Sequence, residues 1–177
     1  DVNGDGYDDV IVGSYMDAGD NWGRVFVYYG SSSGLGTTAD WSVVSPGDSI
    51  FGYRVNTAGD VNGDGYDDVI ISVYIGYHCY VYHGSASGLG TNYEWVPASG
   101  PDWPASPEVG TAGDVNGDGY DDVVISAHGN DETGNSAGKV YVYYGGPVGL
   151  TTSPADWSAV GEQALDSLAC PWRRRGI

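Results

Sequence analysis

The sequence predicts an all-β fold made of about three repeats, each with four short antiparallel strands and one acidic loop. The ten residues DVNGDGYDDV begin at Asp1 and return unchanged at Asp60 and Asp114. Each copy runs directly into a β-branched run, VIVGS, VIISV or VVISA, which is typical of a strand. Glycine is abundant, with 30 residues among 177, and aromatic residues reach 13%, which favours short strands joined by tight turns.

The repeat covers nearly the whole chain and determines the expected architecture. The first strand of each unit is followed by an alternating strand, in GRVFVYYG, YHCYVYHG and GKVYVYYG. A third strand holds Trp41, Trp95 or Trp157, and a fourth, in FGYRVNTAGD, leads into the next loop. Four short antiparallel strands per unit form the blade of a β-propeller, so we expect a propeller segment of about three blades.

The acidic loops have the spacing of a calcium site. Oxygens at the first, third, fifth and ninth places of a tight loop, with the backbone carbonyl of the seventh, can converge on a hard cation. The predicted ligands are Asp1, Asn3, Asp5, Tyr7 and Asp9 in the first loop, Asp60, Asn62, Asp64, Tyr66 and Asp68 in the second, and Asp114, Asn116, Asp118, Tyr120 and Asp122 in the third. One ion per loop gives about three calcium ions.

Two further features support this interpretation. Gly6 and its equivalents let the chain reverse, because glycine adopts a positive φ without steric cost. Each loop also holds four carboxylates in nine residues, which would repel one another without a cation. We expect the remaining acids, Asp8, Asp67 and Asp121, to point outward or to support the ligands. The alternative is a solvated acidic turn, because Asn, Asp and Gly dominate turns for reasons unrelated to metals.

The loops differ from the helical EF-hand, whose pattern requires a glutamate at the twelfth place and flanking helices. The twelfth places here are Val12, Ile71 and Ile125, and each loop feeds a strand. A metal loop that leads into a strand indicates a β architecture rather than a helical calcium sensor.

Charge excludes some partners. The chain has 24 Asp and Glu against 6 Lys and Arg, a net charge of −18, and three calcium ions would leave about −12. Nucleic acid is excluded as a partner because phosphate binding needs clustered Lys and Arg. No apolar run is long enough for membrane insertion. Calcium sites of the extracellular type fill at roughly 0.1 to 1 mM, which favours a secreted or cell-surface location.

The segment FGYRVNTAGDVNGDGYDDVIIS, together with VYVYYG further on, resembles the FG-GAP repeat of the integrin α-subunit propeller and of its bacterial relatives. The resemblance covers residues 1–168, in units 1–59, 60–113 and 114–168. It implies calcium between the first and second strands of each blade, on one rim, and ligands met by variable loops on the opposite face. We expect those loops at residues 14–23 and 127–138, although ordinary hairpin tips fit them equally well.

The function expected from these observations is a calcium-stabilised recognition or adhesion module that is not itself an enzyme. Its ligand would be a protein or a carbohydrate. Two alternatives stay open: the non-catalytic scaffold of an extracellular lyase or phospholipase, and a structural filament or spacer subunit. Three blades are too few to close a ring, so self-association through open blade edges is also expected.

Other candidate residues have mainly structural interpretations. His78, Cys79 and His83 are close in sequence, but His78 and Cys79 point to opposite faces of a strand, which argues against a zinc site. Cys79 aligns with valines of the other units, so a buried thiol is expected. The repeated tryptophans Trp41, Trp95 and Trp157 are expected in the blade core. Trp22 and Trp103 lie in unrepeated polar stretches and are candidate sugar platforms.

Residues 169–177 end the chain in a sequence that breaks the repeat, and residues 173–175 are three arginines. Read one base earlier, their codons can spell GVSVATAGD, which matches GYRVNTAGD of the second unit. We therefore expect a frameshifted or truncated tail, and the arginines are not interpreted as a basic binding patch.

Overall fold

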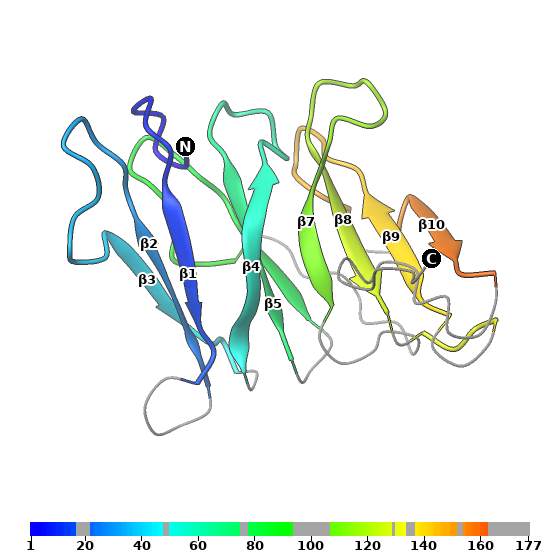
Figure 1. Ribbon diagram of the computed structural model, residues 1–177. Coiled ribbons are helices and arrows are strands. Elements are labelled where there is room, and N and C mark those ends of the chain that lie inside the picture. Colours follow the sequence, from blue (N-terminus) through cyan, green and yellow to red (C-terminus); the bar gives the residue numbers. More distant parts are fainter. Residues whose placement is uncertain are drawn as a thin grey trace, which may run out of the picture.

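The computed structural model describes residues 1–16, 22–47, 50–74, 78–93, 107–128, 130–133, 137–151 and 154–162 (Figure 1). All regular elements in these ranges are strands. They are β1 (Val10–Ser14), β2 (Arg24–Tyr28), β3 (Trp41–Val44), β4 (Phe51–Gly59), β5 (Asp68–Val73), β6 (Cys79–Tyr82), β7 (Glu108–Gly113), β8 (Asp122–Ala127), β9 (Lys139–Tyr143) and β10 (Trp157–Val160). The all-β prediction is confirmed.

The strands form three antiparallel sheets, arranged side by side as propeller blades (Figure 1). The first sheet has the order β1-β2-β3, the second β4-β5-β6 and the third β7-β8-β9-β10. The third sheet is therefore a four-stranded blade of the predicted kind. The segment predicted to hold an outer strand of the second blade, with Trp95, lies outside the described residues, as does the tail at 169–177.

The sheets do not coincide with the sequence repeats, because the last strand of one sequence unit belongs to the sheet of the following unit. Strand β4, which ends the first sequence unit, pairs with β5 of the second unit, with Thr57 opposite Val69 and Gly59 opposite Asp68. Strands β7 and β8 pair in the same way across the third acidic loop. The reason is local: a tight loop brings the two strands that flank it together as a hairpin. The acidic loop thus joins the two innermost strands of a blade.

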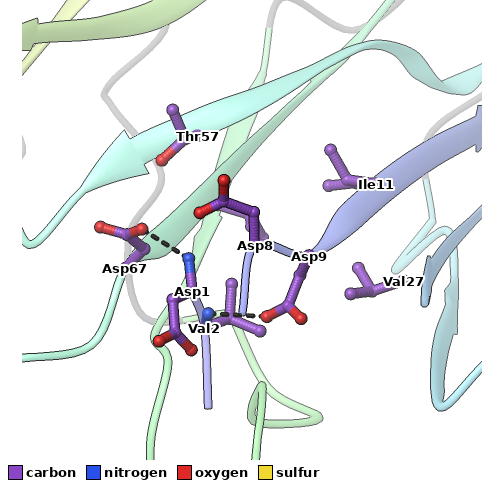
Figure 2. A pocket seen from close by; sticks show the side chains of 9 residues that line it. Asp1, Val2, Asp8, Asp9, Ile11, Val27, Thr57 and Asp67 are labelled. Atoms are coloured by element: carbon purple, nitrogen blue, oxygen red, sulfur yellow. Dashed lines mark hydrogen bonds and ion pairs between the residues drawn. The ribbon is translucent and has the colours of Figure 1, made fainter. Parts of the chain in front are cut away.

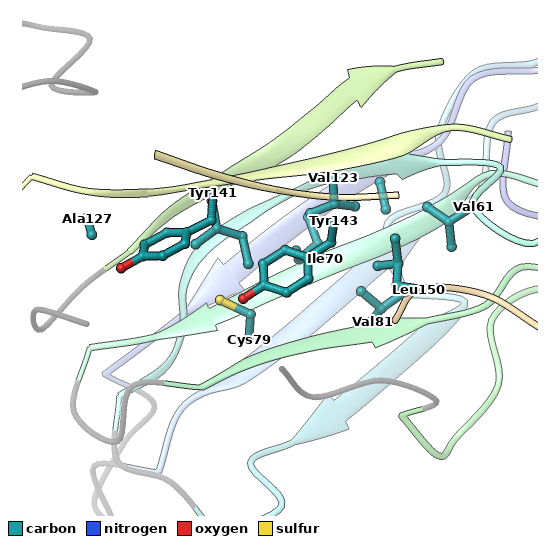
Figure 3. Packing of buried hydrophobic residues seen from close by; sticks show 11 residues of the cluster. Val61, Ile70, Cys79, Val81, Val123, Ala127, Tyr141, Tyr143 and Leu150 are labelled. Carbon is teal, nitrogen blue, oxygen red and sulfur yellow. The ribbon is translucent and has the colours of Figure 1, made fainter. Parts of the chain in front are cut away.

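Two apolar layers hold the three sheets together, because the strands of the middle sheet bury both faces. Val69, Ile71 and Val73 of β5 pack toward the first sheet, while Ile70 packs toward the third. Figure 3 shows the layer between the second and third sheets, where Cys79 lies beside Tyr143. The predicted burial of Cys79 is confirmed, since none of its surface is exposed.

The repeated tryptophans differ in environment. Trp41 is 8% exposed and packs edge to face against Tyr82 of the second sheet. Trp157, at the same repeat position on β10, is 49% exposed, so the prediction that it lies in the core is wrong. The position is buried by the next sheet, and within the described residues no sheet follows β10.

Candidate metal centre

Each acidic loop folds around its first aspartate. In the second loop the N–H groups of Gly63 and Asp64 donate to Oδ1 of Asp60 at 2.7 and 3.0 Å, and the N–H of Gly65 donates to Oδ2 at 2.8 Å. The first and third loops repeat these bonds around Asp1 and Asp114. The three loops are therefore copies in structure as well as in sequence.

The third, fifth and sixth places continue the turn. The side-chain oxygen of Asn62 accepts the N–H of Asp64 at 2.9 Å, and the amide nitrogen of Asn62 donates to Oδ2 of Asp64 at 3.0 Å. Gly65 has a φ of 90°, the left-handed conformation expected from the reversal of the chain. A Cβ on Gly65 would meet nothing within 4 Å, so the backbone conformation alone requires glycine there.

The ninth residue attaches the loop to the blade. Asp68 is fully buried, and its two carboxylate oxygens accept the N–H of Val61 at 3.1 Å and the N–H of Gly84, just after β6, at 2.9 Å. Asp9 and Asp122 make the equivalent pairs of bonds. Burial raises the pKa of Asp68 to about 7; the two backbone hydrogen bonds oppose this rise, and the nearby Asp64 and Asp60 add to it.

The donor set of each loop fits a hard cation. It consists of three carboxylates, one side-chain amide oxygen and one backbone carbonyl, all of them oxygen ligands of the kind that calcium prefers. In the structure, amide N–H groups hold these carboxylates. Among the described residues, no three His, Cys, Asp or Glu side chains gather in a metal-binding arrangement. This applies to the aspartates of the three acidic loops as well as to His78, Cys79 and His83. Carboxylate oxygens have further lone pairs, so the hydrogen bonds leave acceptor capacity for a cation.

Sequence comparison agrees with this architecture. A family model described as the FG-GAP repeat matches residues 106–143, and one described as an FG-GAP-like repeat matches residues 1–71. This chain belongs to the FG-GAP repeat family. The two matches together cover more than half of the chain and include each acidic loop.

Curated relatives of the FG-GAP chain include integrin alpha subunits. It is 36% identical to integrin alpha-6 of Gallus gallus over 102 residues, 51% of this chain and 9% of that protein. It is 26% identical to integrin alpha-PS2 of Drosophila melanogaster over 195 aligned positions, 96% of this chain and 13% of that protein. The chain thus spans only a small part of these relatives. Its assignment to a bacterial branch stays a prediction.

A small pocket of the FG-GAP chain lies between the first loop and the second sheet (Figure 2). Figure 2 shows the carboxylates of Asp1, Asp8, Asp9 and Asp67 around it. Ile11, Val27 and Val69 provide an apolar part of the lining. Asp67 was expected to point outward or to support the ligands, and its Oδ2 accepts a hydrogen bond from the amino group of Asp1 at 2.7 Å.

The opposite end of the blades carries a cluster of aromatic residues, of which Tyr15 and Tyr74 are exposed and Tyr53 is partly buried. Tyr15, just after β1, contacts Tyr53 of β4 with ring centroids 5.7 Å apart, and Tyr53 contacts Tyr74, just after β5, at 4.9 Å. Trp22 is also exposed. The variable segments 14–23 and 127–138 are only partly described, and Trp103 lies outside the described residues. Among those residues, no helix is long and apolar enough to cross a membrane.

Proposed function

We propose that this FG-GAP chain is a calcium-stabilised, non-catalytic recognition module of an adhesive protein that is secreted or displayed on the cell surface. The observation that carries the proposal is the threefold repetition of one all-oxygen loop, which leads into β1, β5 or β8. The second and third copies also join the two innermost strands of a blade. The ligands in each loop are the predicted residues at the first, third, fifth and ninth places and the carbonyl of the seventh. The similarity to integrin alpha subunits supports the adhesive role.

Calcium has a structural role in this proposal. The first and ninth aspartates organise the loop and fix it to the blade, so a cation that binds them stabilises the folded state. At about 2 mM calcium and a Kd of about 0.1 mM, each site contributes roughly 1.8 kcal/mol, and three sites about 5 kcal/mol. That is a large fraction of the stability of a typical domain.

The proposed ligand surface is the end opposite the loops, where Tyr15, Tyr53 and Tyr74 form an aromatic cluster. Tyrosine supplies both an apolar ring and a hydroxyl group, a combination suited to protein or carbohydrate ligands. The net charge of −18 disfavours anionic glycans and nucleic acid as ligands.

Thermal unfolding tests the role of calcium. The chain is melted in EDTA, in about 2 mM calcium, and in the same concentration of magnesium. We expect calcium to raise the Tm by about 10 to 20 °C over EDTA, because about 1 kcal/mol corresponds to about 2 to 4 °C at this size. Magnesium controls for ionic strength and divalent charge. A calcium effect below about 3 °C would contradict the proposal.

A structural role through self-association is the second candidate, because the outer sheets have apolar faces. Val10 and Val12 of β1 are 41% and 43% exposed, whereas their counterparts Val69 and Ile71 in the second sheet are 3% and 0% exposed. The counterparts are covered by the first sheet. A second copy of the chain could cover Val10 and Val12 in the same way.

A further inference from the structure

Neighbouring acidic loops are joined by two hydrogen bonds to one residue. The backbone N–H of Asp60, the first residue of the second loop, donates to Oδ2 of Asp121 in the third loop at 3.0 Å. The N–H of Asp121 in turn donates to the carbonyl of Asp60 at 3.0 Å. Asp1 and Asp67 repeat the arrangement at 2.7 and 3.1 Å, with the α-amino group of Asp1 as the first donor. The eighth residue of a loop thus forms two hydrogen bonds with the first residue of the preceding loop.

Packing reinforces this contact. The ring of Tyr120 lies so close to Gly63 that a Cβ on the glycine would come within 2.5 Å of it, and Tyr66 lies equally close to Gly4. At the residue after Asp60, the carbonyl of Val61 accepts a hydrogen bond from the N–H of Gly146 at 3.0 Å. The second and third blades therefore contact the preceding acidic loop at several residues.

The two hydrogen bonds with Asp121 hold Asp60, the residue around which the second acidic loop folds. The carboxylate of Asp60 accepts three N–H groups of its own loop, so the position of its backbone determines where that carboxylate can lie. Asp121 fixes the backbone of Asp60 on both sides of its α-carbon. The cation then finds a ligand whose main chain is already ordered, which lowers the entropic cost of binding.

We propose that Asp67 and Asp121 are positioning residues that couple calcium binding between adjacent loops. This inference rests on the proposed function, since it requires that the loops bind calcium. Calcium that orders the third loop stabilises the hydrogen bonds between Asp121 and Asp60 and so raises the calcium affinity of the second loop. By thermodynamic linkage, calcium in the second loop raises the calcium affinity of the third loop by the same factor. The array then binds calcium cooperatively.

The chain contains its own control for this proposal. Asp8 is the eighth residue of the first loop, and among the described residues its side chain makes no hydrogen bond to another loop, unlike those of Asp67 and Asp121. Asp8→Ala therefore removes the same side chain as Asp67→Ala and Asp121→Ala but breaks none of the hydrogen bonds that join the loops.

Calorimetric calcium titration of the whole chain and of the three alanine variants tests the coupling. We expect both the wild type and Asp8→Ala to bind calcium cooperatively. Asp67→Ala and Asp121→Ala should lose cooperativity and bind roughly 10-fold more weakly at the affected loops, as is typical when a partner of a metal ligand is removed. Hydrogen exchange gives a second readout. In Asp121→Ala, the amides of Gly63, Asp64 and Gly65 should exchange faster, although the substitution is in another loop.

The possible failures are distinguishable. If the wild type binds no calcium, both the proposed function and this inference are wrong. If it binds calcium and all three alanine variants bind like the wild type, the coupling alone is overturned. If an alanine variant does not fold, Asp64→Ala replaces it as the test, because Asp64 is exposed and belongs to the middle loop. Weaker calcium binding by the first and third loops in Asp64→Ala supports the coupling, and unchanged binding there overturns it.

Discussion

The indole N–H of Trp41 donates a 3.0 Å hydrogen bond to the backbone carbonyl of Gly90. Trp41 belongs to the outer strand of the first sheet, and Gly90 follows the last described strand of the second sheet. The Trp41 ring also meets Tyr82 at a centroid distance of 5.3 Å and an interplanar angle of 72°. A single side chain therefore links two blades by a polar and an aromatic contact.

Trp41→Phe should destabilise the chain by about 1 to 2 kcal/mol, because it removes this hydrogen bond and part of the buried ring. Gly90 is exposed, so water can replace the indole and limit the cost. Trp157→Phe at the equivalent but half-exposed position should cost less than about 0.5 kcal/mol. Urea unfolding measures both variants, and equal losses would contradict the assigned role of Trp41.

The contrast between Trp41 and Trp157 indicates what sequence can predict. Repetition predicted the strands, the acidic loops and the blades, because β-branched runs and glycine-rich turns are local features. Burial of a repeated position depends on a neighbouring sheet, which a repeat alone does not supply. The offset between sequence units and sheets was already implicit in the loop, since a tight loop pairs the strands on either side of it.

The loops show the same limit at the level of single residues. The spacing of Asp60, Asp64 and Asp68 predicted a ligand set, but not that Asp68 would bind two amides and join the loop to the hairpin. The roles of Asp67 and Asp121 depend on the preceding loop, and spacing within one loop contains no information on its neighbour. Their presence in every copy was the available clue, because a residue that only points into solvent has no need to repeat.

The ion pair between Arg54 and Glu108 joins the inner strands β4 and β7, with Nε of Arg54 2.8 Å from each carboxylate oxygen. The two side chains are 39% and 28% exposed, so solvent screens them and the pair should contribute only about 0.5 to 1 kcal/mol. A double-mutant cycle with Arg54→Met and Glu108→Gln measures this coupling energy. We expect it to fall in about 1 M salt. A coupling above about 2 kcal/mol would contradict the screening argument.

Alkaline pH should destabilise the chain because tyrosine and cysteine side chains are buried in the two core layers. Burial, with a smaller contribution from Tyr93, raises the pKa of Tyr82 to about 12 from its usual 10. Burial also raises the pKa of Cys79, and it is the largest of the causes that raise the pKa of Tyr143. The folded state favours the protonated forms. The stability that they contribute is therefore complete below the unfolded pKa values and is lost as pH rises through the folded ones.

For Tyr82 the loss between pH 10 and 12 is on the order of 2 to 3 kcal/mol. Urea unfolding midpoints at pH 8, 9, 10 and 11 measure the trend, and Tyr82→Phe should flatten the part above pH 10. Tyr7→Phe, at an exposed tyrosine, is the control for the loss of a hydroxyl group. A slope that is the same in Tyr82→Phe and the wild type would exclude Tyr82 as a source.

The outward faces of the first and third sheets should make the isolated chain associate head to tail. Val10 and Val12 lie on the outward face of the first sheet, and the half-exposed Trp157 lies on that of the third. Inside the chain, the counterparts of Val10 and Val12 are covered by the preceding sheet, and the counterpart of Trp157 is covered by the following sheet. The first sheet of one copy can therefore pack on the third sheet of another, as adjacent sheets do within the chain. Because this contact joins two different faces, it extends into oligomers or closes into a ring.

Two charge substitutions test this contact by light scattering over a range of concentrations. Val12→Asp blocks one face and Trp157→Asp the other, so each variant alone should be monomeric while the wild type associates. An equal mixture should form dimers and no larger species, because each variant keeps one intact face. Val148→Asp, at a 92% exposed loop position, is the control and should associate like the wild type. If the wild type is monomeric at all concentrations, or if the mixture stays monomeric, the two faces do not recognise each other.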